Sequence, residues 1–371
     1  MSSNRRPRPR LRALILVSLL ALCGSLVVVR CHSATGPPTP PRAGQTIGEA
    51  YGGFSTDGRL PFLPDADVTR QFDLMKQSGA HRVRISLFWS VIEDSPGQYD
   101  WRTSDRLIAA AAGRDLEVLA LLTYSPSWAT GTDNDKVAPR NPSDIGPFAR
   151  AAVTRYAPKG VHAWEIWNEP NVADSWAPRP DVGAYAQLLT TAAASIRAVD
   201  ASATIVSGGL APARNTVDRT AINPVTFVRG LYDNGASKSF TALGLHPYTF
   251  PALPLQQTAQ SNGFQGARQI RQVMVDRGDR DKQIWFTEFG APTGSARDAV
   301  GLDVQSQSVA QAYSAITGWP WAGPLYYYTL RDAGTDGADR ESNFGLLRFD
   351  YAAKPAWETF LRQMSMKQRS Y

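Results

Sequence analysis

Residues 161–171 read VHAWEIWNEPN, a strand-like run in which glutamates stand among the most apolar residues of the chain. A buried strand normally excludes carboxylates, because taking an unpaired charge out of water costs several kcal/mol or more. Pro170 cannot continue the ladder of a sheet, so we expect the strand to close at Glu169. Either these glutamates lie at a surface, or at least one of them has a position where its charge has a function.

The same kind of short β-rich run recurs along the chain at intervals of roughly 35–45 residues. The intervals contain stretches with helical spacing, and several of these begin at Asp or Ser and finish near Gly, as capped helices do. The β-rich runs begin near Ile47, His81, Leu116, Val161, Ala203, Thr241, Lys282 and Pro324. Eight strands that alternate with helices predict a (β/α)8 TIM barrel. The alternative is a doubly wound open sheet, but YGGFSTDG after the first run does not form its GxGxxG phosphate turn.

A barrel gathers its catalytic groups at the C-terminal ends of the strands. Glu169 closes the fourth predicted strand and Glu288, in WFTEFG, closes the seventh. The two positions are about three βα units apart, so we expect them to face one another across the barrel mouth. Two carboxyl groups on opposite sides of one pocket are what cleavage of a glycosidic bond requires.

The N-terminal 44 residues differ in character from the rest. Residues 1–30 contain a basic stretch and the apolar run 13–29, which predict a signal peptide or an N-terminal membrane anchor, and 31–44 form a Pro-rich linker. Lipidation at Cys31 is a further alternative, although Arg30 stands where a small residue is expected before a lipidated cysteine. We therefore expect an exported protein, either secreted or tethered to the outer face of the cytoplasmic membrane, whose single catalytic domain spans 45–371.

The net charge of +6 comes from this segment, whose first 42 residues contain seven arginines and no acid. The remaining chain has 32 basic and 33 acidic residues, so no basic face for nucleic acid is predicted. Both cysteines, Cys23 and Cys31, also lie in the segment, so the predicted domain has no disulfide and no thiol nucleophile.

Three motifs at the expected strand ends carry a family resemblance. WNEP (167–170), HPY (246–248) and TEFG (287–290) resemble glycoside hydrolase clan A, with the cellulase-like family 5 and the xylosidase-like family 39 as the most similar families. WSVIEDSPGQYDW (89–101) and NFGLLRFDYAAKPAW (343–357) fit the same patterns, so the resemblance covers nearly all of 45–365. It implies that Glu169 is the acid/base and Glu288 the nucleophile of a retaining hydrolase.

The resemblance and the chemistry of the residues predict further contacts around these two acids. Arg84, at the end of the second strand, would keep the nucleophile ionised. Asn168 would donate to the sugar hydroxyl beside the anomeric carbon. His246 and Tyr248 match the clan's strand-six pair and are expected to contact the substrate, and Tyr248 would also hydrogen-bond the nucleophile. Tyr328 stands where the clan typically has tryptophan, and the strand-three histidine of many members is missing. Aromatic loop residues that we expect to contact the sugar are Trp128, Trp89 and Tyr124.

One geometric difficulty follows from the alternation of side chains along a strand. Asn168 and Glu169 are adjacent, so both reach one pocket only if the strand has already begun to turn at Pro170. The same alternation places Glu165 on the face of Glu169, and we interpret Glu165 as a buried, hydrogen-bonded structural acid.

These observations predict a retaining glycoside hydrolase that acts by double displacement on a β-linked polysaccharide or oligosaccharide and needs no cofactor. No HxH or HExxH pair occurs, which weakens a metal-dependent polysaccharide deacetylase on the same fold, and no metal ligand is predicted. A catalytically inactive sugar-binding barrel stays open as the non-enzymatic alternative. The sugar, the linkage, endo or exo action and the oligomeric state are not predicted.

Overall fold

The computed structural model describes residues 52–258 and 263–368. All of them belong to the unit Thr46–Tyr371. The predicted signal or anchor segment and the Pro-rich linker lie outside the described residues. None of the described helices is both long and apolar enough to cross a lipid bilayer.

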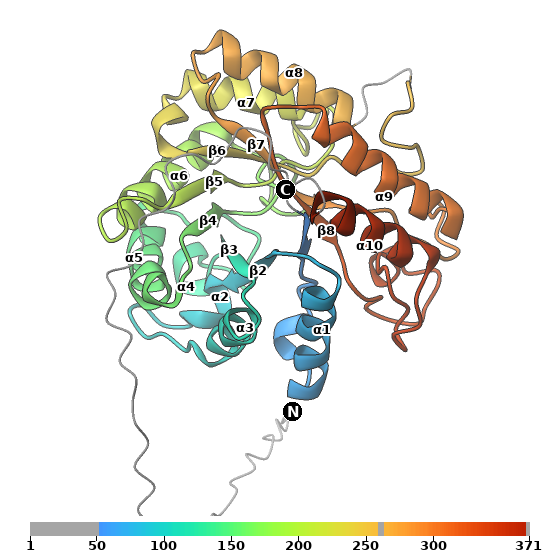
Figure 1. The fold of residues 1–371 in the computed structure, drawn as a ribbon. Coiled ribbons are helices and arrows are strands. Elements are labelled where there is room, and N and C mark those ends of the chain that lie inside the picture. Colours follow the sequence, from blue (N-terminus) through green and yellow to red (C-terminus); the bar gives the residue numbers. More distant parts are fainter. Residues whose placement is uncertain (1–51, 259–262, 369–371) are drawn as a thin grey trace, which may run out of the picture. The chain divides into compact units, whose positions relative to one another are not determined.

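Eight parallel strands close into a barrel in sequence order, β1 pairing with β8, which confirms the predicted (β/α)8 fold (Figure 1). The strands are short, and residues on both of their faces are buried, as expected for a parallel sheet covered by helices. Their bounds are β1 Gly52–Ser55, β2 Arg82–Phe88, β3 Glu117–Thr123, β4 Ala163–Ile166, β5 Thr204–Ser207, β6 Ala242–Leu245, β7 Gln283–Phe289 and β8 Ala322–Tyr328.

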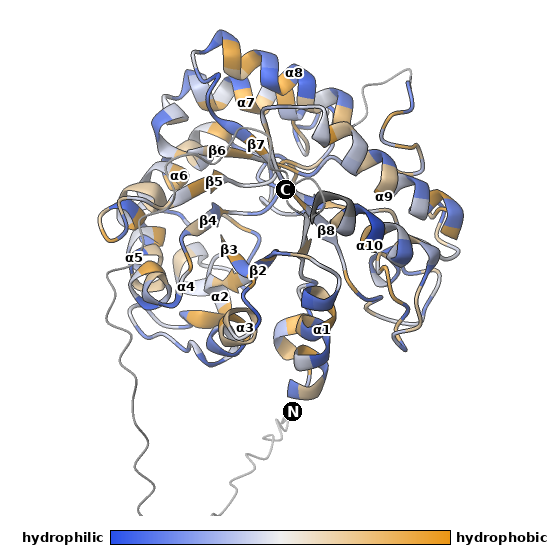
Figure 2. Cartoon of the chain, in the orientation of Figure 1, coloured by the Kyte–Doolittle hydropathy of each residue, from blue (hydrophilic) through white to orange (hydrophobic). Residues whose placement is uncertain are grey.

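Helices surround the ring of strands (Figure 1). The longer ones are α1 Asp65–Gln77, α3 Arg102–Ala112, α5 Ile145–Tyr156, α6 Val182–Arg197, α7 Pro224–Asp233, α8 Gly263–Asp276, α9 Leu302–Thr317 and α10 Pro355–Gln368, and two single turns are α2 Trp89–Ile92 and α4 Ser127–Thr130. Hydrophobic and hydrophilic residues alternate along them, as α8 shows in Figure 2. Its buried residues Phe264, Ala267, Ile270, Val273 and Met274 recur every three or four positions and pack on the barrel wall.

Two strand ends differ from the sequence prediction. β4 stops at Ile166, three residues before the predicted end at Glu169. β2 continues to Phe88, so Arg84 lies within the strand and its side chain is buried in the barrel, whereas the sequence analysis placed it at the strand end. The second correction places a charged side chain deeper in the barrel than the strand end.

The β8–α10 loop (329–354) is fixed by a buried ion pair. The ammonium of Lys354 donates to Asp332 Oδ1 at 2.7 Å and to Thr293 Oγ1 at 3.0 Å, and Asp332 also accepts from the amide of Gly345 at 2.8 Å. Both partners are buried, and burial raises the pKa of Asp332 and lowers the pKa of Lys354 despite their mutual attraction. This pair holds in place the loop that supplies Phe344 to the cavity described below.

Breaking this pair should destabilise the domain. We expect Lys354→Met to lower the free energy of unfolding by about 3 kcal/mol, because it leaves the Asp332 carboxyl buried without its cation. Lys76→Met, which removes an exposed partner of Asp115 at 3.8 Å, should leave that free energy nearly unchanged. Urea unfolding of both variants measures the difference, and equal midpoints would contradict the structural role of the pair.

Candidate active site

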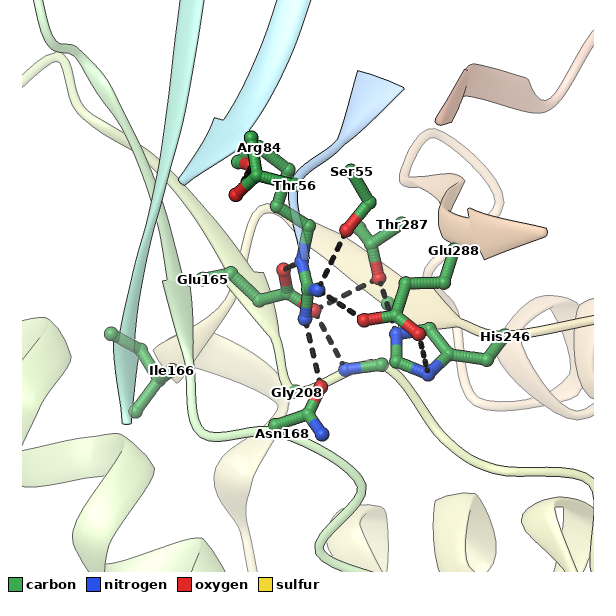
Figure 3. A network of polar contacts seen from close by, with 12 residues as sticks. Ser55, Thr56, Arg84, Glu165, Ile166, Asn168, Gly208, His246, Thr287 and Glu288 are labelled. Atoms are coloured by element: carbon green, nitrogen blue, oxygen red, sulfur yellow. Dashed lines mark hydrogen bonds and ion pairs between the residues drawn. The ribbon is translucent and has the colours of Figure 1, made fainter. Parts of the chain in front are cut away.

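The guanidinium of Arg84 organises the C-terminal mouth of the barrel (Figure 3). Its Nε donates to Glu165 Oε2, its Nη1 donates to Glu288 Oε1 and to Ser55 Oγ, and its Nη2 donates to Asn168 Oδ1 at 2.9 Å. The side chain is 3% exposed. Because the guanidinium is planar and its donors point in fixed directions, one side chain sets the positions of two carboxylates and one amide.

Glu165, on β4, is the carboxylate on the inner side of Arg84. It is fully buried, and its Oε1 accepts from the amide of Gly209 and from Thr287 Oγ1, each at 2.9 Å. Together with Arg84, these donors satisfy both oxygens. The prediction of a buried, hydrogen-bonded structural acid is therefore confirmed.

Glu288, near the end of β7, faces the cavity and is 14% exposed. Its Oε1 accepts from Arg84, and its Oε2 accepts from the hydroxyl of Tyr248 at 2.8 Å. Burial by itself would raise the pKa of Glu288. The charges of His246 and Arg84 and the hydrogen bond from Tyr248 outweigh burial and lower this pKa, so the carboxyl group is an anion at neutral pH.

Glu169 reaches the same cavity because the chain leaves the regular strand geometry after β4. Trp167 has φ +69° and Glu169 has φ +46°, left-handed values that bulky residues rarely adopt. They break the alternation of side chains, so that adjacent Asn168 and Glu169 both line the cavity. The geometric difficulty raised by the sequence is resolved at Trp167, before the proline.

His246, just after β6, lies between the two cavity carboxylates. Its Nδ1 is 2.9 Å from Glu169 Oε1 and 3.6 Å from Glu288 Oε2, and its Nε2 is 3.1 Å from Thr287 Oγ1. A Cβ at Gly209 would stand 2.1 Å from this Nε2, so only glycine leaves room for the ring. Burial would lower the pKa of His246, but Glu288 and Glu169 together raise it.

The imidazole is fully buried and does not form part of the cavity lining. This corrects the expectation that His246 contacts the sugar. The ring lies behind the carboxylates and orients them.

The cavity has a volume of about 720 Å³, within the usual range for small-molecule sites. Residues predicted for the site that line it are Arg84, Tyr124, Asn168, Glu169, Tyr248, Glu288 and Tyr328. Oxygen atoms of Glu169 and Glu288 lie within 4.8 Å of one another. The structure therefore brings the two predicted acids together at one cavity.

Four aromatic rings form a continuous wall on one side of this cavity. Phe344 lies 5.9 Å from Tyr248, 5.6 Å from Phe250 and 5.3 Å from Tyr328, measured between ring centroids. Phe250 and Phe344 are lining residues that sequence reasoning missed. Both belong to loops whose path depends on tertiary contacts. The sequence around them does not indicate which side chains point into the cavity.

Two predicted aromatic contacts are placed elsewhere. Trp89 is fully buried, stacks on Phe148 at 5.7 Å, and donates its indole N–H to Glu93 Oε2 at 2.5 Å. Trp128 donates to the backbone oxygen of Glu93 at 2.9 Å, and neither tryptophan lines the cavity. These residues pack the β2 and β3 loops against each other, which corrects their assignment as sugar contacts.

Tyr124 does line the cavity, but the faces of its ring are covered. The ammonium of Lys136 lies 3.8 Å from the ring centroid, and Lys136 is a lining residue that the sequence analysis missed. The Phe88 ring stacks on Tyr124 with 6.1 Å between the ring centroids, so neither face of the Tyr124 ring is free, contrary to the stacking role expected for it.

Glu169, His246 and Glu288 also form a potential metal-binding group, since one ligand atom of each lies within 4.8 Å of the others. A search for HxH or HExxH spacing could not reveal this group, because its members lie in or after three different strands, β4, β6 and β7. Their ligand atoms already have protein partners, and the Arg84 guanidinium beside Glu288 repels a cation. The arrangement is better suited to two carboxylates that act directly on a substrate.

A (β/α)8 barrel with two opposed carboxylates at its C-terminal mouth is the arrangement typical of glycoside hydrolase domains. The sequence profile of the cellulases, glycosyl hydrolase family 5, matches residues 43–323. The chain therefore belongs to this family. No curated protein sequence is significantly similar to it.

Solved structures with similar folds include a family 39 glycoside hydrolase from Bacteroides cellulosilyticus WH2, with 20% identity and a TM-score of 0.69 over 85% of this chain and 63% of that one. The family 39 enzyme from Xanthomonas axonopodis pv. citri has 20% identity and a TM-score of 0.65, and the match covers 85% of this chain and 66% of that one. Xylanase 10B from Thermotoga petrophila RKU-1 has 13% identity and a TM-score of 0.58, and the match covers 86% of this chain and 95% of that one. The chain thus spans just under two thirds of the two family 39 proteins, and these likenesses show the fold.

Removal of the Tyr248 hydroxyl tests the electrostatics of the site. We expect Tyr248→Phe to raise the pKa of Glu288, because the anion loses one of its hydrogen-bond donors. NMR titration of protein with ¹³C-labelled glutamate carboxyl groups measures this pKa. Tyr232→Phe, which removes a remote phenol bound to Asp279, should leave it unchanged, and identical titration curves for both variants would contradict the account.

Proposed function

We propose that this domain hydrolyses β-linked O-glycosidic bonds with retention of anomeric configuration. The observation that carries the proposal is the distance of at most 4.8 Å between oxygens of Glu169 and Glu288 at the cavity. Retaining enzymes place their two carboxyl groups about 5–5.5 Å apart, so that one can attack the sugar directly. Inverting enzymes leave about 6.5–9.5 Å for an intervening water.

Glu288 is proposed as the nucleophile. Its lowered pKa keeps it ionised, and Arg84 and Tyr248 fix both of its oxygens. In the first step a carboxylate oxygen of Glu288 bonds to the anomeric carbon while the bond to the leaving oxygen breaks, which gives a glycosyl ester. The contact with Arg84 then helps the carboxylate to leave when water attacks the ester.

Glu169 is proposed as the acid/base. Its side chain is 22% exposed, more than that of Glu288, and no arginine or lysine forms an ion pair with it among the described residues. It would give its proton to the leaving oxygen in the first step and take a proton from the attacking water in the second. The contact with His246 Nδ1 orients the carboxyl group toward the bond that is cleaved.

Asn168 is proposed to bind the hydroxyl beside the anomeric carbon. Its Oδ1 accepts from Arg84, which fixes the amide orientation, and its Nδ2 donates to the hydroxyl of Tyr124, another lining residue, at 3.4 Å. The second N–H of the amide is available to a sugar hydroxyl. A donor held in this way can strengthen its hydrogen bond as charge develops on the sugar. Tyr328, at the end of β8, is proposed to contact the same sugar ring.

The substrate is proposed to be a β-linked polysaccharide or oligosaccharide outside the cell. Structural neighbours include a β-xylosidase from Caulobacter crescentus CB15 and an exo-β-1,4-mannosidase from Opitutaceae bacterium strain TAV5, both named for action on β-linked sugars. The basic and apolar segment 1–30 supports export, with or without a retained anchor.

Replacement of each acid by its isosteric amide tests these roles. We expect Glu288→Gln to abolish hydrolysis of aryl β-glycosides, because the amide is not a nucleophile. Glu169→Gln should lower kcat/KM about 10²–10⁴-fold for substrates with poor leaving groups and much less for dinitrophenyl glycosides, whose leaving group needs no proton. Added azide should restore turnover of Glu169→Gln by replacing the water that needs a base.

Four outcomes would contradict the proposal. Hydrolysis that survives both substitutions would remove the two glutamates from the reaction. An inverted anomer as the first product by proton NMR would exclude double displacement. Activity that a chelator abolishes would favour the metal-dependent alternative at Glu169, His246 and Glu288, and sugar binding without any hydrolysis would favour an inactive barrel.

A further inference from the structure

A tyrosine of α6 is built into the sheet between β4 and β5, next to the turn that carries Glu169. Tyr185 is fully buried, and its hydroxyl donates to the backbone oxygen of Ile166 at 2.9 Å and accepts from the amide of Gly208 at 2.6 Å. Ile166 is the last residue of β4, and Gly208 directly follows β5. The proposed reaction gives this side chain no role, and it does not line the cavity.

The hydroxyl of Tyr185 takes the place of one backbone hydrogen bond between these parallel strands. Earlier in the same pair of strands, the amide of Thr204 donates to the oxygen of His162 at 2.8 Å. Four residues further along both strands, the same register would join the amide of Gly208 to the oxygen of Ile166. Both of these groups bind the Tyr185 hydroxyl instead.

The next backbone bond between the strands is displaced as well. The regular register would join the amide of Asn168 to the oxygen of Gly208. The structure joins the amide of Glu169 to the oxygen of Gly209 at 3.0 Å, one residue further along both strands. The left-handed φ of +69° at Trp167 lies between the inserted hydroxyl and this bond. The interruption of the ladder therefore coincides with the turn that brings Glu169 to the cavity.

A tyrosine hydroxyl is suited to this place because the interruption releases one buried carbonyl and one buried amide. Such groups are costly unless a partner pairs with each. A hydroxyl has one hydrogen to donate and lone pairs that accept, so a single atom satisfies both. Burial raises the pKa of Tyr185, which keeps the hydroxyl protonated. The ring packs against Trp176 at 5.7 Å and Phe227 at 5.6 Å between centroids, and these contacts fix the position of the hydroxyl.

Glycine at position 208 is the second requirement of this arrangement. A Cβ there would stand 2.5 Å from the oxygen of Trp167 and 2.8 Å from the oxygen of Ile166. Even alanine would therefore push the turn after β4 away from β5. The turn is held from two directions, by the hydroxyl of Tyr185 and by the close approach of Gly208.

We infer that Tyr185 is a positioning residue for the proposed acid/base, and that its hydroxyl directs Glu169 into the cavity by interrupting the ladder between β4 and β5. Without the hydroxyl, the two backbone groups would pair directly or stay unpaired, and either result displaces the turn at Trp167. Glu288 lies on β7 and does not depend on this turn. The inference rests on the proposed role of Glu169 and adds to it a residue outside the cavity.

Tyr185→Phe tests the inference, because it keeps the ring and removes only the hydroxyl. We expect it to lower kcat/KM about ten- to hundredfold for aryl β-glycosides with poor leaving groups, whose oxygen needs the proton of Glu169. For dinitrophenyl glycosides, which need no proton, kcat/KM should stay within about threefold of the wild-type value. The ratio of the two values does not depend on how much of the protein is folded, so a loss of stability alone leaves the ratio unchanged.

Two further variants complete the test. Tyr313→Phe is the matched control, because this tyrosine of α9 is also buried and its hydroxyl has no hydrogen-bond partner among the described residues. It should cleave both substrates as the wild type does. Gly208→Ala disturbs the same turn by a different route, so it should lower the ratio in the same direction as Tyr185→Phe.

A wild-type ratio in Tyr185→Phe, whether both activities fall equally or neither falls, would overturn the inference and leave the proposed function intact. If Tyr185→Phe does not fold, the ratio in Gly208→Ala decides in the same way. If Glu169→Gln itself shows no dependence on the leaving group, the acid role proposed for Glu169 has failed, and the inference fails with it.

Discussion

The burial of one cation, the Arg84 guanidinium, is the constraint on which the mouth of this barrel depends. A charge in the interior is tolerated only when partners satisfy it, and Arg84 has Glu165 on one side and Glu288 on the other. Burial opposes its charge, but these two carboxylates raise the pKa of Arg84 above its already high value. The ion pair that keeps the arginine charged also keeps Glu288 ionised, so one interaction serves both the fold and the proposed reaction.

The roles of the three glutamates at the barrel mouth follow from their surroundings. Glu165 has no solvent exposure and several donors, which makes it a structural counter-charge. Glu288 shares the same guanidinium but opens to the cavity. Glu169 lies opposite Glu288, has His246 as its hydrogen-bond partner, and is the more exposed of the two cavity acids. All three residues are glutamates, so their surroundings, and not the residue type, determine which is the structural counter-charge, which the proposed nucleophile and which the proposed acid/base.

The repeating pattern of β-rich and helical stretches was sufficient to predict the barrel, because the period of the strands and the burial of a parallel sheet are local properties of the chain. The position of Glu288 near the end of β7 followed from the same pattern, whereas Glu169 lies three residues beyond β4 and not at its end. The left-handed turns at Trp167 and Glu169 could not be predicted, since non-glycine residues adopt them only under tertiary constraint.

The aromatic residues were the least predictable part of the site. Trp89 and Trp128 appeared suited to a sugar surface, yet both pack around buried Glu93, while Phe250 and Phe344 line the cavity. The amino-acid sequence shows that a loop contains aromatic residues. It does not report which way each ring turns, which depends on partners distant in sequence.

The central claim is that Glu288, held by Arg84, attacks the sugar. The most direct measurement uses a 2-deoxy-2-fluoro glycoside with a good leaving group. The fluorine slows both steps through their oxocarbenium-like transition states, and the good leaving group keeps formation of the glycosyl-enzyme faster than its breakdown. Mass spectrometry of the intact protein and of its peptides should find one added sugar, attached at Glu288. A sugar attached at any other residue, or hydrolysis that proceeds without any labelled protein under these conditions, would contradict the account.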